Sequence, residues 1–229
     1  MNDSERDLRQ QVIDTCRQLE ALGLNQGTAG NVSVRCADPA AGFLLTPTSL
    51  PYDRMVPEDI VRVTLDGRCA GRCQPSSELP FHLAIMQRRR DASAVIHTHS
   101  TYATTIACLR REIPAVHYLV GLFGGNTLPC AEYATYGTPE LSDHLMRALA
   151  GRRATLLANH GLVVLGASLQ QALALTHEAE TLATIYWRTL CAGEPTILPA
   201  AEMATIVEKF RDLGYGPVGG AGGEAPALR

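Results

Sequence analysis

The chain has 229 residues, is 46% hydrophobic and 19% charged, and carries a formal net charge of −3 at pH 7. These values predict one globular domain with a sizeable core, placed over residues 1–215, and a Gly-, Ala- and Pro-rich tail over residues 216–229 that we expect to be mobile. The lack of a large basic block argues against nucleic acid as a partner, and the lack of an apolar run of about 18 residues argues against a membrane span, so we expect a cytoplasmic protein.

Hydrophobic periodicity and turn residues predict helices and strands along the whole chain. Helices are expected over residues 4–22, 76–90, 101–109, 138–149, 168–191 and 200–213, with Ser76 or Ser77 capping the second. Extended segments are expected over residues 31–34, 43–46, 61–65, 94–99, 114–118, 127–131 and 156–165. The seven cysteines are scattered, and only Cys69 and Cys73 lie close together, so no thiolate zinc site is predicted.

Three histidines follow apolar stretches and are candidates for a metal site. The apolar residues 94–96 run into His97 and His99, and a second apolar stretch leads to His160, which Gly161 follows. Side chains two residues apart on a strand point to the same side, so the first two imidazoles can meet at one point. A catalytic zinc takes three protein ligands and keeps one position open. By itself, the short motif is equally typical of ordinary surface or core histidines.

Two further segments could bind a phosphate. The loop over residues 25–30 contains two glycines and a threonine, and such a loop can direct backbone N–H groups and hydroxyls at an anion. An ordinary glycine-rich turn explains the same residues. The helix expected near residue 76 begins with two serines, and its free N–H groups and positive dipole end favour an anion. Glu78 is expected in the first turn of that helix.

Several motifs, taken in order, resemble the class II aldolase/adducin family and cover roughly residues 8–212. The matching stretches are residues 24–33, 46–48, 75–78, 97–99, 113–118, 133–137 and 160–161. The resemblance implies an α/β fold of three layers, α/β/α, with a large mainly antiparallel central sheet. It also implies a homotetramer whose active sites lie between subunits, and a zinc-dependent aldolase that cleaves a ketose 1-phosphate reversibly to dihydroxyacetone phosphate and a small aldehyde.

The resemblance also implies a role for individual residues. His97, His99 and His160 correspond to ligands of one zinc ion (Zn²⁺) per chain, with Mn²⁺ or Co²⁺ as alternatives, and Glu78 corresponds to the acid–base residue that can also approach the metal. Tyr118 corresponds to a proton donor or acceptor that a neighbouring subunit contributes. The side chains that correspond to the phosphate site are Thr28, Asn31, Thr48, Ser49, Ser76 and Ser77.

Departures from the family pattern leave the substrate open. Ser49 stands where the family has glycine, Tyr136 stands where its aldolases have phenylalanine, and Tyr215 lies only near the position of a C-terminal tyrosine. Residues 121–123 and Glu132 also differ, on the side implied to touch the aldehyde. L-Fuculose 1-phosphate and a 5-deoxy- or 5-methylthio-pentulose 1-phosphate are therefore both expected candidates.

Three other activities occur on the same scaffold. A methylthioribulose-1-phosphate dehydratase would use similar ligands and stays an alternative. A pentulose-phosphate 4-epimerase is disfavoured because similar sequences carry Asp where this chain has Glu78. A non-enzymatic adducin-like scaffold would have lost the three histidines.

Overall fold

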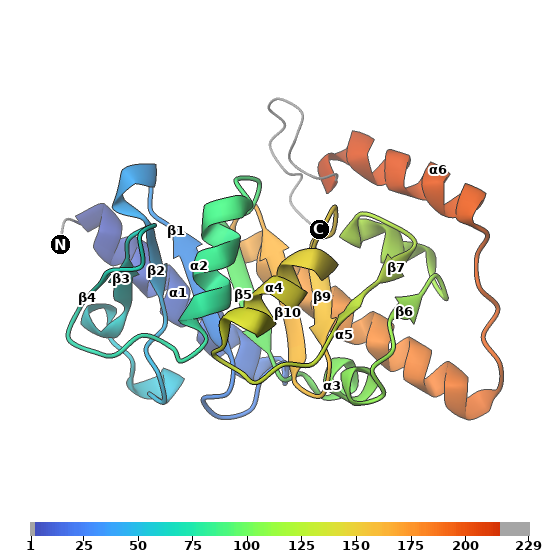
Figure 1. Ribbon diagram of the computed structural model, residues 1–229, viewed down its shortest axis with the longest axis horizontal. Helices are drawn as coiled ribbons and strands as arrows, with labels where there is room; N and C mark the ends of the chain where they lie inside the picture. Colours follow the sequence, from blue (N-terminus) through green and yellow to red (C-terminus); the bar gives the residue numbers. More distant parts are fainter. Residues whose placement is uncertain (1–2, 216–229) are drawn as a thin grey trace.

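Eight strands form one large sheet with helices on both faces (Figure 1). The computed structural model describes residues 3–215, and the predicted mobile tail over residues 216–229 lies outside them. The helices are α1 (Asp3–Ala21), α2 (Leu79–Arg88), α3 (Thr101–Cys108), α4 (Pro139–Ala148), α5 (Leu169–Ala192) and α6 (Ala200–Phe210). The strands are β1 (Asn31–Arg35), β2 (Phe43–Leu45), β3 (Val61–Val63), β4 (Cys69–Ala70), β5 (Ala94–Thr98), β6 (Ile113–Pro114), β7 (Thr127–Leu128), β8 (Cys130–Ala131), β9 (Ala154–Leu157) and β10 (Gly161–Gly166).

The sheet has the order β4-β3-β2-β1-β5-β10-β9-β8. Every neighbouring pair in it is antiparallel except β8 and β9, which are parallel. Strands β6 and β7 pair with each other in a separate two-stranded sheet. The expected large, mainly antiparallel sheet is therefore confirmed.

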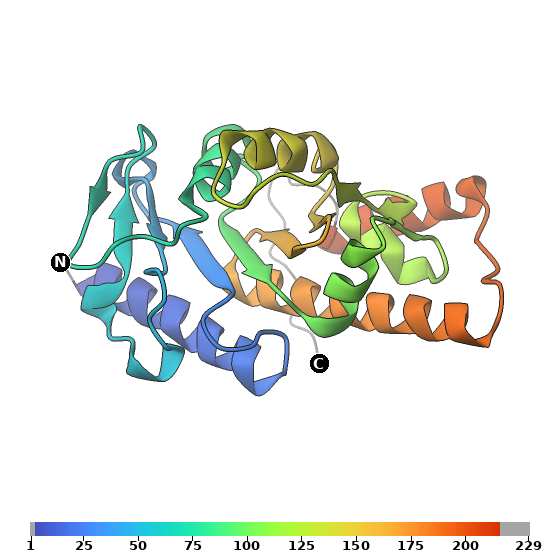
Figure 2. The same cartoon turned by 60° about the horizontal axis from the view of Figure 1, so that its bottom comes forward.

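Alternating side chains of the central strands build separate cores on the two faces of the sheet. Val95 of β5 packs in the core beneath α2 and α4, whereas its neighbour Ile96 packs against α1. Val163 and Val164 of β10 divide in the same way between the α2 face and the α5 face. Figure 2 shows α2 and α4 above the sheet and α1 and α5 below it. This arrangement is the three-layer α/β/α fold that the resemblance implies.

Two local expectations were wrong. Helix α2 begins at Leu79, and its N-cap is Glu78, so neither predicted serine caps it directly. Instead, the Ser76 hydroxyl accepts a hydrogen bond from the backbone N–H of Glu78 at 3.2 Å. Tyr118, expected in an extended segment, begins the 3-10 helix η4 (Tyr118–Phe123).

Within residues 3–215, no helix combines the length and the apolar character needed to cross a membrane. The cytoplasmic location stays a prediction.

Candidate active site

The three candidate histidines converge at one edge of the central strands. His97 lies on β5 directly opposite Asn31 of β1, His99 follows two residues later, and His160 ends the turn that leads into β10. Their ligand nitrogens all lie within 4.8 Å of one another. The Nε2 atoms of His97 and His99 are 3.0 Å apart. The structure thus brings together the residues that the sequence predicts as metal ligands.

The hydrogen bonds of His97 favour a bound metal. Its Nδ1 lies 3.0 Å from the carbonyl oxygen of Leu162, and a carbonyl only accepts, so Nδ1 carries a proton and Nε2 is the nitrogen left to face the other two histidines. Burial, followed by the charges of His97 and His160, lowers the pKa of His99 to about 4, which keeps that ring in the neutral form that metals bind. The three ring nitrogens lie close enough together to ligate a single metal ion.

Glu78 faces this cluster from the start of α2. Its side chain is buried, with Oε2 3.0 Å from His97 Nε2 and Oε1 3.2 Å from His160 Nε2. Burial alone would raise the pKa of Glu78, but the charge of His97 and hydrogen bonds from His160 and His97 outweigh it and hold the pKa far below its usual range. The carboxylate is therefore ionised at neutral pH and available as a base or a ligand.

A cavity of about 260 Å³ opens beside Glu78, and its small polar side chains come from three segments, residues 28–31, 47–49 and 76–78. All six predicted phosphate residues line it, together with Glu78, His99, His160 and Tyr136: they are Thr28, Asn31, Thr48, Ser49, Ser76 and Ser77. The backbone N–H of Ser76 donates to Thr46 O, and that of Thr48 donates to Gln74 O, each at 3.0 Å. These two bonds hold the second and third segments together.

Ser49 has a backbone conformation that glycine adopts more easily than serine. Its φ is 56°, in the left-handed region that glycine adopts without strain. Serine at this position keeps the loop conformation at some cost in strain and adds a hydroxyl to the cavity wall.

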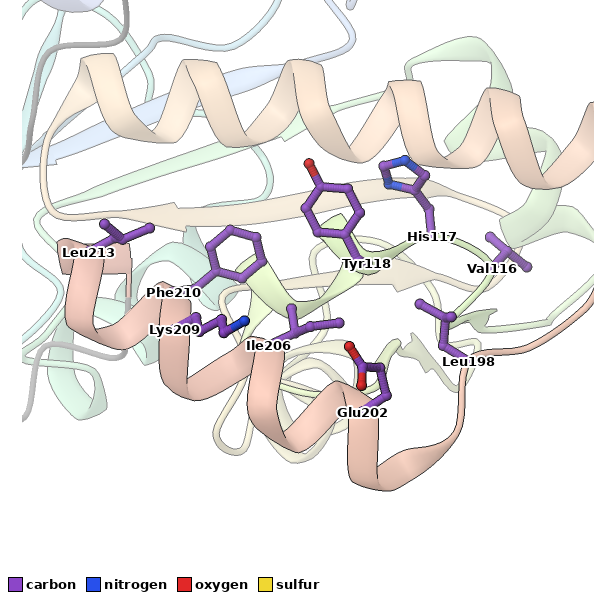
Figure 3. Close-up of a pocket in the computed structure, with 9 residues that line it drawn as sticks. All are labelled: Val116, His117, Tyr118, Leu198, Glu202, Ile206, Lys209, Phe210 and Leu213. Carbon is purple, nitrogen blue, oxygen red and sulfur yellow. The ribbon is translucent and has the colours of Figure 1, made fainter.

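Tyr118 does not line the cavity that holds the histidines. It lies 49% exposed in a second cavity of about 660 Å³ between η4 and α6 (Figure 3). The Tyr118 ring stacks on Phe210 of α6, with centroids 6.2 Å apart. Within a single chain, Tyr118 and the candidate metal ligands therefore lie in separate cavities.

Two buried polar residues next to the site, His82 and Ser33, were not predicted from the sequence. Both ring nitrogens of His82 lie within hydrogen-bonding distance of side chains on β1, which are Asn31 and Ser33. A weak signal was present in the sequence. Glu78 and His82 are four residues apart on one helix face, and Asn31 and Ser33 are two apart on one strand face.

Comparisons with known proteins give the family. The sequence model described as Class II Aldolase and Adducin N-terminal domain matches residues 10–187. The L-fuculose phosphate aldolase of Escherichia coli (strain K12) is 48% identical over 208 residues, covering 90% of this chain and 95% of that protein. The 5-methylthioribulose-1-phosphate/5-deoxyribulose-1-phosphate aldolase of Rhodospirillum rubrum is 48% identical over 207 residues, covering 90% and 92% respectively. A solved L-fuculose 1-phosphate aldolase superposes with a TM-score of 0.86 at 40% identity, covering 90% of this chain and 96% of that chain. The chain belongs to the class II aldolase and adducin family.

Proposed function

We propose that the protein is a zinc-dependent aldolase that cleaves a ketose 1-phosphate reversibly to dihydroxyacetone phosphate and a small aldehyde. The observation that carries the proposal is the convergence of three histidine nitrogens within 4.8 Å of one another beside a buried carboxylate. His97, His99 and His160 would hold the zinc. When bound there, the metal supplies Lewis-acid stabilisation of the negative charge that develops as the carbon–carbon bond breaks.

Glu78 is proposed to move the proton on the dihydroxyacetone phosphate carbon. In the direction of condensation, its ionised carboxylate takes a proton from the carbon that carries the free hydroxyl. In the direction of cleavage, the carboxyl would have to carry a proton in the substrate complex and would give it to the same carbon, and the proton taken from the substrate hydroxyl would replace it. The lowered pKa of Glu78 and its position 3.0 Å from His97 support this role because they provide an ionised base beside the metal ligands.

The polar end of the cavity is proposed to bind the substrate phosphate. Hydroxyls of Thr28, Thr48 and Ser76 and the amide of Asn31 line that wall. Binding energy from the phosphate would orient the reacting carbons against Glu78. Tyr136 is 65% exposed on the rim of the same cavity, where it would contact the aldehyde half.

The active site is proposed to be shared between chains of a homotetramer, with Tyr118 of one chain completing the zinc site of its neighbour. The support is that Tyr118 is half exposed and lines a different cavity from the histidines of its own chain. In the direction of cleavage, this tyrosine would act as a phenolate that takes the proton from the hydroxyl beyond the breaking bond, and in the direction of condensation the phenol would give that proton back.

Mixing two impaired variants tests the shared site. Tyr118→Phe should keep its zinc and lose much of its cleavage rate, and His97→Ala should lose both zinc and activity. After subunit exchange, verified by mass spectrometry, some sites would hold two intact halves, and activity should exceed that of both parents. Activity that stays at parental levels after verified exchange would show that Tyr118 acts in its own chain or has no catalytic role.

A coupled assay for dihydroxyacetone phosphate tests the proposed reaction and its substrate. The named relatives act on L-fuculose phosphate and on 5-methylthio- or 5-deoxyribulose 1-phosphate. We expect release of dihydroxyacetone phosphate from one of these three ketose phosphates, dependent on a divalent metal. Loss of water from the methylthio substrate without release of dihydroxyacetone phosphate would instead identify a dehydratase. Full activity in metal-free protein would contradict the metal site.

A further inference from the structure

A chain of buried polar side chains leads from β1 and α2 to the candidate base. His82 is fully buried, with Nδ1 2.7 Å from Ser33 Oγ and Nε2 2.5 Å from Asn31 Oδ1. The amide nitrogen of Asn31 then donates to Glu78 Oε2 at 2.9 Å. Neither His82 nor Ser33 lines the active-site cavity, so neither touches substrate there.

The chemistry of the four groups fixes the direction of every bond. The amide nitrogen of Asn31 donates to a carboxylate oxygen of Glu78, so the NH₂ group of Asn31 faces Glu78. The amide oxygen of Asn31 therefore faces His82, and because that oxygen also only accepts, Nε2 of His82 must carry the ring proton. The Nδ1 atom of a neutral ring is then an acceptor, and the Ser33 hydroxyl must donate to it.

We propose that His82 is a positioning residue that holds the Asn31 amide in the one orientation that serves both the base and the substrate phosphate. With its oxygen bonded to His82, the amide presents both N–H groups toward the site. One N–H is bonded to Glu78, and the other has no partner within residues 3–215, although Asn31 lines the cavity proposed for phosphate. Asn31 would thereby connect the phosphate to the carboxylate that moves the proton.

Without His82, the Asn31 amide could rotate by half a turn. Its oxygen would then face the Glu78 carboxylate, and two acceptors at 2.9 Å repel each other. Such a rotation would also turn both donors away from the phosphate. Burial favours the neutral ring because it lowers the pKa of His82 to about 3, so this hydrogen-bond pattern is kept through the neutral pH range. The catalytic part of the inference rests on the proposed function, whereas the orientation of the amide does not.

A double-mutant cycle tests whether His82 acts through Asn31. His82→Phe keeps the ring shape and removes both hydrogen bonds. We expect it to weaken binding of inorganic phosphate, measured by calorimetry, and to lower kcat for the phosphorylated ketose, each by roughly tenfold to a hundredfold. Adding the same change to Asn31→Ala should alter either quantity by no more than about twofold. His82→Gln, whose amide can donate to Asn31, should restore most of the loss.

Two controls separate positioning from loss of stability. Ile85→Val removes a methyl group from a buried position one turn further along α2, and it should leave phosphate binding and kcat unchanged. Zinc content per chain should stay the same in all variants. An equal loss from His82→Phe in the wild-type and Asn31→Ala backgrounds would overturn the proposal.

The wild-type protein offers an independent test that needs no variant. Nitrogen NMR of protein labelled at histidine should show the proton of His82 on Nε2, with Nδ1 unprotonated. A proton on Nδ1 would overturn the proposal even if the variants failed to fold. If wild-type protein released no dihydroxyacetone phosphate, the proposed aldolase activity would fail, but phosphate binding and the His82 tautomer would still decide the role of His82.

Discussion

Acidification should destabilise the protein through His82, and the effect can be worked out from the structure. Burial lowers the pKa of His82 from its ordinary value of 6.5 to about 3; the negative charge of Glu78 opposes this, and the charge of His97 adds to it. Below pH 6.5 the unfolded chain binds a proton that the folded chain excludes. The contribution of His82 to folding stability is therefore complete above pH 6.5 and is lost as the pH falls toward 3.

The size of this contribution follows from the two pKa values. They differ by about 3.5, and each pKa unit corresponds to about 1.4 kcal/mol, so the full loss is about 5 kcal/mol. Between about pH 6 and pH 4, His82 should contribute a slope of about 1.4 kcal/mol per pH unit to the free energy of unfolding. Replacing His82 by Phe should remove that slope.

Urea unfolding of wild-type protein and His82→Phe between pH 4 and pH 7 measures the difference. Both proteins should be studied at one concentration, because association between chains would otherwise shift the apparent stability, and with a chelator to remove the effect of metal release. The exposed His177 provides the control, since His177→Phe makes the same chemical change away from the buried network. Parallel curves for wild type and His82→Phe would refute the argument that the folded protein holds this ring neutral.

Three further predictions concern the candidate site. Glu78→Gln should lower turnover by roughly 10²–10⁴-fold while zinc analysis finds the ion still bound; zinc loss as severe as in a histidine variant would make Glu78 an essential ligand. Ser76→Ala should raise KM for the phosphorylated ketose, and inorganic phosphate should compete with substrate; equal efficiency with the unphosphorylated sugar would contradict a phosphate site. Gly161→Ala should lower zinc content and thermal stability, because the added methyl would overlap the Thr98 carbonyl oxygen and lie 2.9 Å from the His99 ring; unchanged zinc content would contradict the tight packing there.

The sequence was informative where function depends on local spacing. Alternation along a strand placed His97 and His99 on one side, and the structure brings their nitrogens to within 3.0 Å of each other. The sequence determined the third candidate ligand less well, because His160 is 61 residues beyond His99 and only the order of the motifs connected the two. The sheet supplies the missing link, since β5 and β10 are neighbours.

The sequence could not reveal groups whose partners are distant in the chain. His82 follows Phe81 and precedes Leu83, so it reads as one more residue of a buried helix face. Its two hydrogen-bond partners are 49 and 51 residues away, and only the packing of α2 over β1 brings them together. The role of Tyr118 is hard to predict for a different reason. The proposal places Tyr118 of one chain beside the metal of another chain, and the sequence of a single chain does not show contacts between chains.

Asn31 and the proposed metal ligand His97 are buried in the central strands, whereas the residue proposed to contact the aldehyde is exposed. Asn31, His97 and Val163 lie on adjacent strands in one cross-strand row, and the first two are buried among polar partners. A change there would disturb the base and the metal ligands together. Tyr136 is 65% exposed and lines the same cavity as Glu78, so a substitution there would change the space in the cavity without disturbing the buried network. Under the proposed function, a change at Tyr136 would alter the preference for the aldehyde, while the register of the central strands would hold Asn31 and His97 in place.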